Sequence, residues 1–163
     1  MDKCISEIAP IIKDYYERLS SQRPDLTSSV QLSAPAFDER EAMRAISTIL
    51  SGMISQGANV KEFEANAARY FGTSSGIATN SGSSSNLIAL LALKEHFDIQ
   101  DGAEVILPAT TFATVSMPVI QAGLTPVYVD VDIESLNISS AEVQRAISEK
   151  TKILMPVHTL GYP

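Results

Sequence analysis

The chain has 163 residues, which is the size of one ordinary domain and too short for a large multidomain enzyme. Hydrophobic residues make up 45% of it and charged residues 19%, a balance that excludes a disordered tail, a collagen-like repeat and a coiled coil. Its 12 Lys and Arg residues are outnumbered by 19 Asp and Glu residues, and the net charge of -7 argues against nucleic acid as a partner.

Cysteine content and the first residues bear on the cellular compartment. The one cysteine, Cys4, cannot form an intramolecular disulfide, a CxxC redox pair or a zinc ribbon, so we expect a reducing compartment and no metal site. Lys3 and Glu7 stand where a secretion signal would have an unbroken apolar stretch. The longest apolar run, Leu87–Leu93, is far shorter than the roughly 20 residues that cross a bilayer. The sequence predicts a cytoplasmic protein without a membrane segment.

The first 36 residues are expected to form an extension. Apolar residues recur at helical spacing from Ile5 to Leu19, which predicts an amphipathic helix. Residues 20–36 mix Ser, Pro, Asp and Thr and predict a connector, with at most a short strand around Val30–Leu32. We therefore assign residues 1–36 to a helical extension with its connector and residues 37–163 to the main domain.

Two patterns typical of capping boxes predict the next two helices. Asp38 is followed three residues later by Glu41, and Asn59 is followed in the same way by Glu62. The two expected helices end at about Met53 and at Gly72.

From residue 76 onward, short apolar or β-branched segments alternate with helical stretches. This β-α-β-α-β-α-β order predicts an α/β fold, a mostly parallel sheet with helices on both faces. Gly123 would follow a helix in the left-handed conformation, and Ser139 with Glu142 forms another capping box. The expected strands are 76–80 (GIATN), 104–109 (EVILPA), 125–132 (TPVYVDVD) and 151–158 (TKILMPVH), and the expected helices are 83–97, 111–122 and 140–148.

In open parallel sheets, ligands collect at the carboxyl ends of the strands. Residues 80–86, Asn-Ser-Gly-Ser-Ser-Ser-Asn, follow the first expected strand and open a long apolar helix. Free N–H groups, the positive helix end and the serine hydroxyls would form a cup that suits a phosphate. The alternative is that Ser83 only caps the helix. The segment has neither the lysine of a P-loop nor the GxGxxG dinucleotide fingerprint.

Other residues at this predicted edge could either bind a ligand or have only a structural role. Phe112, in the turn after the second expected strand, could stack on a flat cofactor ring or belong to the core. Asp130 and Asp132 are favoured as solvated carboxylates at a strand end. His158 could approach a ligand or bond its own loop, whereas His96 is expected on an exposed helix face.

Four motifs follow one another along the chain, and both their order and their spacing are informative: GANVKEFEANAARYFG, IATNSGSSSNLIALLAL, DGAEVILPATTFATVSMPVIQAGLTPVYVDVD and TKILMPVHTLGYP. Over residues 57–163 the chain resembles the DegT/DnrJ/StrS family of nucleotide-sugar aminotransferases. NSGSSSNL, the turn around Phe112, HTLGYP and the N-terminal helix look closest to the deoxysugar 3-dehydratases of lipopolysaccharide biosynthesis. The resemblance implies the fold-type I aminotransferase fold, with residues 37–163 as the N-terminal part of the pyridoxal-phosphate-binding large domain, incomplete at its C-terminus.

The resemblance also implies a cofactor, a substrate and site residues. The cofactor would be pyridoxal 5'-phosphate or pyridoxamine 5'-phosphate, and the substrate a nucleotide-linked keto-deoxysugar. The reaction would be C3 dehydration or amino transfer in lipopolysaccharide or other surface-polysaccharide biosynthesis. Gly82, Ser83 and Ser84 would hold the cofactor phosphate, and Phe112 would stack on the pyridine ring. The full-length enzyme would be a homodimer.

The family's catalytic residues are not matched. The carboxylate that pairs with the pyridine nitrogen, and the lysine that bonds to the cofactor (a histidine in the dehydratases), lie after HTLGYP in the family and are expected beyond Pro163. No lysine among Lys61, Lys94, Lys150 and Lys152 stands in that context. We expect the N-terminal part of a longer enzyme. The alternatives are a noncatalytic remnant or module that binds a phosphate or a partner subunit, and a dinucleotide-binding domain, which would need the missing glycine fingerprint.

Overall fold

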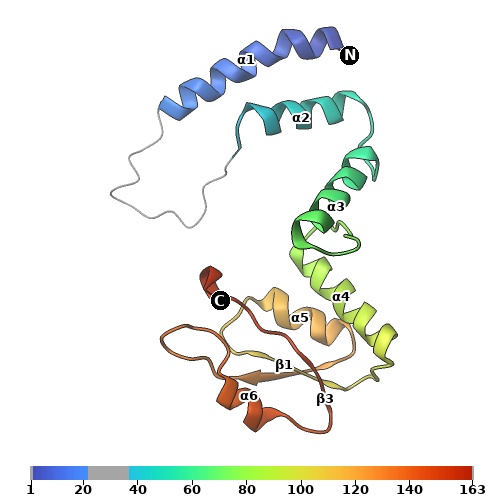
Figure 1. Ribbon diagram of the computed structural model, residues 1–163, viewed down its shortest axis with the longest axis vertical. Coiled ribbons are helices and arrows are strands. Elements are labelled where there is room, and N and C mark those ends of the chain that lie inside the picture. The colour runs from blue at the N-terminus through green and yellow to red at the C-terminus, as the bar shows by residue number, and fades with distance from the viewer. Residues whose placement is uncertain (1, 22–36, 163) are drawn as a thin grey trace. The chain divides into compact units, whose positions relative to one another are not determined.

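The computed structural model describes residues 2–21 and 37–162, and the chain divides into two compact units, residues 1–76 and 77–163 (Figure 1). The helices of the first unit are α1 (Asp2–Ser21), α2 (Glu39–Leu50) and α3 (Ala58–Phe71). The second unit contains α4 (Gly82–Phe97), β1 (Glu104–Pro108), α5 (Ala113–Gln121), β2 (Thr125–Val129), α6 (Ser140–Ala146), β3 (Thr151–Leu154) and the 3-10 turn η1 (Thr159–Gly161). The strand expected around Val30–Leu32 lies outside the described residues, and a domain boundary after residue 36 stays a prediction.

Helix α1 confirms the expected amphipathic helix and extends it at both ends. It packs against α2, and its half-buried apolar residues, which share one helical face, are Ile5, Ile8, Ala9, Ile12 and Tyr16. Pro10 lies inside the helix and removes one intrahelical hydrogen bond, because proline has no N–H.

The capping box at the start of α2 is confirmed. Asp38 Oδ1 accepts the Arg40 N–H at 2.8 Å, and Glu41 Oε2 accepts the Asp38 N–H at 2.8 Å. The Arg40 guanidinium also bonds the Asp38 carboxylate, and these hydrogen bonds hold the pKa of Asp38 well below its usual range. The helix ends at Leu50, before the expected Met53.

The capping box expected at Asn59 and Glu62 is wrong. Helix α3 begins two residues earlier than expected, with Gly57 as its N-cap and no side-chain cap. Asn59 and Glu62 instead both bind Arg44 of α2, so a contact between helices takes the place of a local cap. The predicted end at Gly72 is confirmed, because Gly72 adopts φ +68°, which favours a residue without Cβ.

The second unit is built on a parallel sheet of order β2-β1-β3. The chain runs from β1 through α5 to β2 and then crosses back through α6 to β3, so its two connections move in opposite directions across the sheet. Right-handed crossovers then place α5 and α6 on opposite faces, and Figure 1 shows them on either side of the strands. The predicted parallel α/β architecture is confirmed.

Two local expectations in this unit are wrong. Residues 76–80 are not a strand, because they do not join the sheet formed by β2, β1 and β3. Ser139 precedes α6 but makes no side-chain cap bond, and Glu142 pairs with Arg145 instead. The three observed strands are shorter than expected, because the backbone pairing of β1 with β2 and with β3 stops before the expected strand ends.

The core of the second unit lies around β1. Val105, Ile106 and Leu107 are fully buried, and successive residues of a strand point to opposite faces. Val105 and Leu107 therefore share the face that α4 and α5 cover, where they pack with Leu90 and Val119. Both helices are thus held on one side of the sheet by apolar burial.

Replacing Gly123 by Ala is expected to lower the free energy of unfolding by about 1–2 kcal/mol, because an L-residue is strained in the left-handed region. Gly123 has φ +75°, and a Cβ there would lie 2.9 Å from Asp101 Oδ1. Gly102→Ala is the matched control, since Gly102 has φ +79° and no atom near its added Cβ. Urea unfolding should show a loss for both variants, slightly larger for Gly123→Ala. An unchanged midpoint for both would contradict the expectation.

Candidate functional site

The N-terminus of α4 contains the predicted phosphate cup. Ser81 is the N-cap, and its Oγ accepts the Ser84 N–H at 3.2 Å. The sequence-based alternative that Ser83 caps the helix is therefore wrong, since the cap lies two residues earlier. Among the described residues, no acceptor is paired with the N–H groups of Gly82 and Ser83, as is usual in a first helical turn.

The residues around this turn are held in place by hydroxyl contacts. Thr79 Oγ1 lies 2.5 Å from Ser85 Oγ and donates to the Ser81 carbonyl oxygen at 2.9 Å. Ser85 Oγ also bonds the Ser81 carbonyl at 3.2 Å. A Cβ on Gly82 would meet no atom within 4 Å, so the space beside this glycine is open. The turn is ordered by its neighbours while its first N–H groups stay accessible.

Phe112 lies in the turn between β1 and α5 and is the N-cap residue of α5. Its side chain is 79% exposed, so it does not belong to the core of the described structure. The neighbouring Thr111 Oγ1 is buried and has no hydrogen-bond partner among the described residues. A buried unpaired hydroxyl costs about 1–3 kcal/mol, and such costs are concentrated at functional turns.

One side-chain bond joins these two turns. Asn86 Nδ2, in the first turns of α4, donates to the Thr114 carbonyl oxygen, in the first turn of α5, at 3.2 Å. Helices α4 and α5 pack against each other, so their N-termini meet at the carboxyl edge of β1. Sequence reasoning assigned no role to Asn86, because a bond across 28 positions leaves no local pattern.

The remaining predicted residues lie in different places. Asp130 and Asp132 are exposed as expected. Asp132 Oδ1 accepts the Ser135 N–H at 2.9 Å, the Ser135 hydroxyl and the Glu134 N–H, and these bonds hold the pKa of Asp132 below its ordinary value. His158 is exposed at the start of η1 after β3, and His96 is exposed on α4 as expected.

Lysines do not gather at the carboxyl edge in the described second unit. Lys94 Nζ donates to the Ala122 carbonyl at 2.6 Å and pairs with Asp101, near the C-terminal ends of α4 and α5. Lys150 precedes β3, and Lys152 Nζ donates to the Glu149 carbonyl oxygen at 3.0 Å. All three therefore lie at the amino edge of the sheet, opposite the phosphate cup.

The two turns suit a phosphorylated aromatic cofactor. A helix N-terminus with free N–H groups favours a phosphate dianion, and an exposed aromatic ring beside it offers a flat apolar surface. Gly82, Ser83 and Ser84, predicted to hold the phosphate, lie in the first turn of α4, and Phe112, predicted to stack on the ring, is the N-cap of α5. The chemistry of these groups fits pyridoxal 5'-phosphate.

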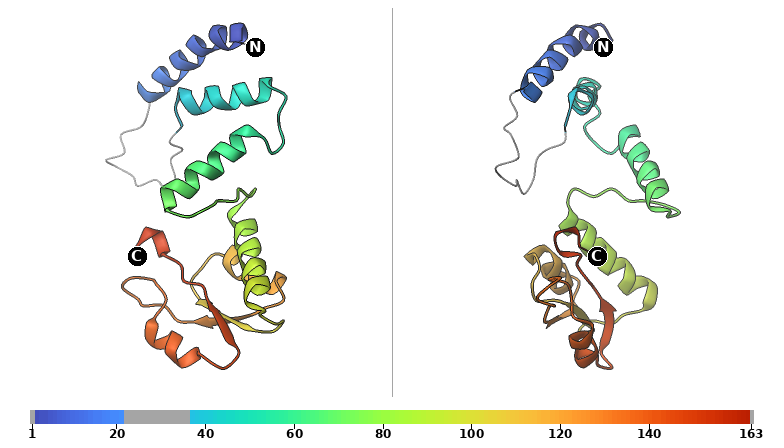
Figure 2. Two further views of the ribbon diagram at one scale, coloured as in Figure 1. Left: turned by 45° about the vertical axis from the view of Figure 1, so that its right-hand side comes forward. Right: turned by 60° about the vertical axis from the view of Figure 1, so that its left-hand side comes forward.

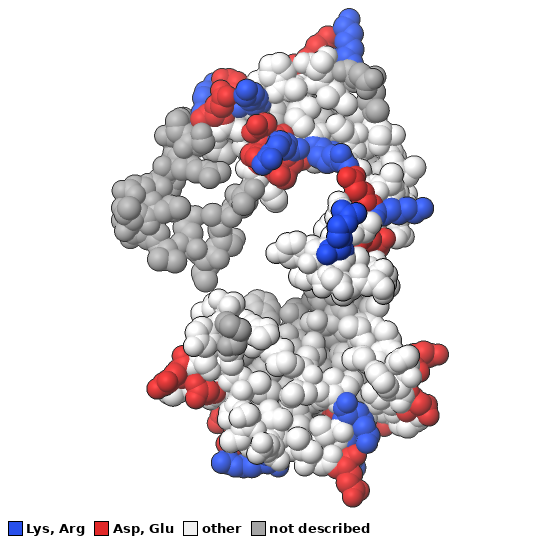
Figure 3. Space-filling model, in the orientation of Figure 1, with Lys and Arg blue, Asp and Glu red and all other residues white. Residues whose placement is uncertain are grey.

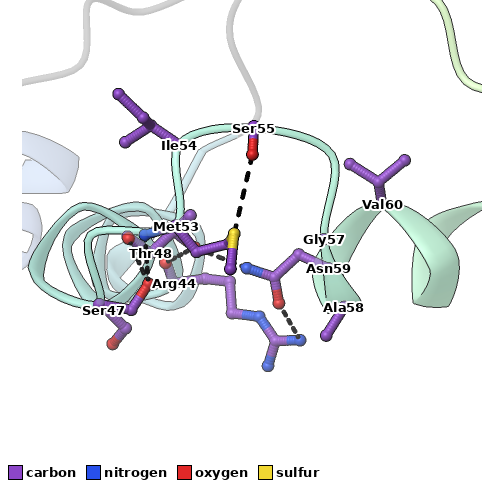
Figure 4. A pocket seen from close by; sticks show the side chains of 11 residues that line it. Arg44, Ser47, Thr48, Met53, Ile54, Ser55, Gly57, Ala58, Asn59 and Val60 are labelled. Carbon is purple, nitrogen blue, oxygen red and sulfur yellow. Dashed lines mark hydrogen bonds between the residues drawn. The ribbon is translucent and has the colours of Figure 1, made fainter.

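A hollow lies in the first unit, between α2 and α3, with a volume of about 510 Å³ (Figure 4). Arg44 spans the helices to Asn59, and Asn59 Nδ2 donates to Thr48 Oγ1 at 2.8 Å. Its lining includes the hydroxyls of Ser47, Thr48, Ser51 and Ser55, with Met53 and Ile54. Sequence reasoning missed this pocket, because its residues match no ligand-binding pattern and are brought together only by helix packing.

On the face shown in Figure 3, several Lys and Arg side chains lie next to Asp and Glu side chains, and much of the rest is uncharged. Within residues 2–21 and 37–162, no helix is long and apolar enough to cross a membrane. The same described residues contain no group of three His, Cys, Asp or Glu side chains arranged to hold a metal ion.

Comparison with known proteins bears on both the fold and the site. The DegT/DnrJ/EryC1/StrS aminotransferase family matches residues 35–163. The chain is 34% identical over 157 residues to a dTDP-4-dehydro-2,6-dideoxy-D-glucose 3-dehydratase of Saccharopolyspora spinosa, covering 93% of this chain and 34% of that protein. It is 35% identical to the lipopolysaccharide biosynthesis protein RfbH of Salmonella typhimurium, covering 95% and 37%. The chain thus spans about a third of the length of these relatives.

A solved structure agrees with the fold. The chain matches the Escherichia coli GDP-4-keto-6-deoxy-D-mannose-3-dehydratase with bound hydrated PLP at a TM-score of 0.76 and 32% identity, over 83% of this chain and 35% of that chain. This match confirms the predicted fold-type I architecture over part of that enzyme's length. The family model covers more than half of the chain, and sequence and structure agree. The chain belongs to the DegT/DnrJ/EryC1/StrS aminotransferase family.

Proposed function

We propose that this chain is the N-terminal part of an enzyme that uses pyridoxal 5'-phosphate or pyridoxamine 5'-phosphate to modify nucleotide-linked keto-deoxysugars. The reaction is C3 dehydration or amino transfer, in lipopolysaccharide or other surface-polysaccharide biosynthesis. The observation that carries the proposal is the Asn86 bond to Thr114, which joins a phosphate-binding helix end to the turn of an exposed Phe112. Membership of the family and the named 3-dehydratase relatives support it.

Each site residue has a defined role in this proposal. The N–H groups of Gly82 and Ser83 and the hydroxyls of Ser83 and Ser84 bind the phosphate, assisted by the positive end of α4. Phe112 covers one face of the pyridine ring and excludes water from it. The bound cofactor supplies an electron sink, and the chain's own residues orient it.

Assembly and location are part of the same proposal. The full-length enzyme is a homodimer in the cytoplasm that takes a nucleotide-linked sugar as substrate.

The proposal is tested by adding pyridoxal 5'-phosphate to the purified protein and recording circular dichroism across the cofactor's absorption band. The free cofactor is achiral, so a band appears only when it is bound in a chiral site. We expect a saturable band that inorganic phosphate suppresses by competition. A protein that gives no band at millimolar cofactor would overturn the proposal.

A noncatalytic role is the second candidate. It is favoured by the lysines of the second unit, which lie at the amino edge of the sheet and away from the phosphate cup. Treating the protein with cofactor and borohydride separates the two candidates. In the full-length protein, a stable cofactor adduct on a lysine beyond Pro163 supports an aminotransferase, whereas binding without an adduct favours either a dehydratase or a module that only binds phosphate. Turnover of a nucleotide-linked keto-deoxysugar distinguishes these last two.

Replacing Phe112 by Ala is expected to weaken cofactor binding about tenfold, because ring stacking contributes about 0.5–1.5 kcal/mol beyond the buried area. Stability should change little, since the side chain is 79% exposed. Titration followed by the induced circular dichroism band measures the affinity. Phe97→Ala is the control, because Phe97 is 64% exposed at the far end of α4 and should leave binding unchanged. Equal affinities in all three proteins would remove Phe112 from the site.

A further inference from the structure

The side chain of Asn137 joins two segments that are distant in sequence. Its Oδ1 accepts the Thr159 N–H at 3.0 Å, and its Nδ2 donates to the Tyr162 carbonyl oxygen at 3.0 Å. Thr159 Oγ1 adds a bond to the Leu136 carbonyl oxygen at 2.9 Å. The Asn137 amide therefore binds a backbone donor at the start of η1 and a backbone acceptor just after its end.

The η1 turn depends on these bonds for its place. Its own backbone bonds run from Gly161 N–H to His158 and from Tyr162 N–H to Thr159, each at 3.1 Å, and a single 3-10 turn is marginal alone. Leu160 in its middle is 87% exposed and adopts φ +55°, so it adds strain and little packing. Among the described residues, the hydrogen bonds that join η1 to the rest of its unit all reach Leu136 or Asn137.

The loop that carries Asn137 is itself well ordered. It is closed by an isolated bridge between Val131 and Ile138 and by the bond from Asp132 N–H to the Asn137 carbonyl oxygen at 2.9 Å. The Asp132 carboxylate accepts the bonds of Glu134 and Ser135 described above. The loop follows β2, and Figure 2 allows the reader to trace it beside the C-terminal turn. The position of Asn137 is thus fixed by the hydrogen bonds within its own loop.

The held turn stands at a place where ligands collect. Strands β1 and β3 are parallel neighbours in the sheet, so the residues that follow them lie at the same carboxyl edge, where ligands collect in α/β sheets. Phe112 follows β1 and His158 follows β3. No hydrogen bond of the His158 imidazole to another described residue is present, so its ring nitrogens are available to a ligand.

We propose that Asn137 is a positioning residue that clamps the His158–Tyr162 turn and so presents His158 at the cofactor edge of the sheet. This inference rests on the proposed pyridoxal-phosphate function. His158 is the group that meets the ligand, and Asn137 acts only through it. The amide is required because it both donates and accepts, which neither Asp nor Leu can do at neutral pH.

The chain has only two histidines, so NMR of the imidazole carbons reports His158 directly and His96 serves as an internal reference. In the wild-type protein without cofactor, we expect two distinct signals. Adding pyridoxal 5'-phosphate should shift the His158 signal and leave that of His96, which is exposed on α4, unchanged.

Asn137→Ala should move the His158 signal to its free-peptide position in the protein without cofactor and abolish the cofactor-induced shift. The affinity read from circular dichroism should change by less than about threefold, because the phosphate binds at α4. Asn137→Asp keeps the acceptor for Thr159 N–H and should give an intermediate shift. Ser135→Ala is the matched control, since it removes hydrogen bonds within the same loop without touching η1.

Each outcome decides the proposal. A His158 signal that is the same in Asn137→Ala and wild type overturns the clamp, even if the cofactor binds. A His158 signal that ignores bound cofactor in the wild type overturns its place at the site. Equal effects of Asn137→Ala and Ser135→Ala mean that loop order alone is responsible, which also overturns it. Absence of the circular dichroism band in the wild type overturns the proposed function. The clamp is then tested separately by comparing the His158 NMR signal of Asn137→Ala with that of the wild type, both without cofactor.

Discussion

Replacing Ser83 by Asp is expected to reduce pyridoxal-phosphate affinity more than about a hundredfold, or about 2.7 kcal/mol, without lowering stability. The carboxylate would lie in the first turn of α4, where the helix end favours a negative charge by about 0.3–1 kcal/mol. The same charge occupies the place of the phosphate and repels it. The substitution should therefore maintain or raise stability while it lowers cofactor affinity. A misfolded variant would lose both stability and affinity. Induced circular dichroism measures binding and urea unfolding measures stability.

A matched control separates the local charge from the change in net charge. Ser140→Asp places the same carboxylate at the first position of α6, in the same unit and also at a helix N-terminus. It should bind cofactor as the wild type does. If Ser83→Asp retains wild-type affinity, the N-terminus of α4 is not the phosphate site.

Replacing Leu107 by Ala is expected to lower the free energy of unfolding of the second unit by about 2–5 kcal/mol. Leu107 is fully buried in the middle strand and packs on the face covered by α4 and α5. Removing its branched end leaves a cavity among Leu90, Val105 and Val119, which are also buried. Because these helices carry the proposed phosphate cup and Phe112, cofactor binding should weaken as the unit unfolds. Urea unfolding followed by far-ultraviolet circular dichroism measures the loss.

Leu91→Ala provides the comparison, because it removes the same atoms from a side chain that is 46% exposed on α4. It should cost less than about 1 kcal/mol, in line with partial burial. A Leu107→Ala variant as stable as Leu91→Ala would show that β1 is not the centre of the core.

Periodicity predicted most of the elements correctly, since helix and strand patterns depend on neighbouring residues. The helix over 5–19, the strands that begin at Glu104, Thr125 and Thr151, and the left-handed Gly123 are all present. The segment 76–80 has a strand-like pattern but does not join the sheet of β2, β1 and β3, and a strand forms only by pairing with a neighbour. Local pattern therefore overestimated the sheet by one strand.

Capping chemistry was less predictable. Asp38 and Glu41 form the expected box because nothing else competes for them apart from the adjacent Arg40. Asn59 and Glu62 have the same spacing, but Arg44 of the neighbouring helix takes both side chains. A side-chain N-cap stabilises a helix by about 1 kcal/mol. A single contact between two helices can contribute as much, so it can draw the side chain away from the cap.

By itself, the sequence determined the family and the parallel α/β order, because each depends on short contiguous motifs, and it also predicted the residues of the phosphate cup. Only the tertiary structure decided that Ser81 caps α4, that Phe112 is exposed, and that Asn86 and Asn137 join turns 28 and 22 positions apart. Such bonds form when packing of α4 and α5 on β1 and closure of the parallel sheet bring distant backbone groups within reach. Hydrogen-bond partners depend on distance in space, and no local pattern encodes that distance.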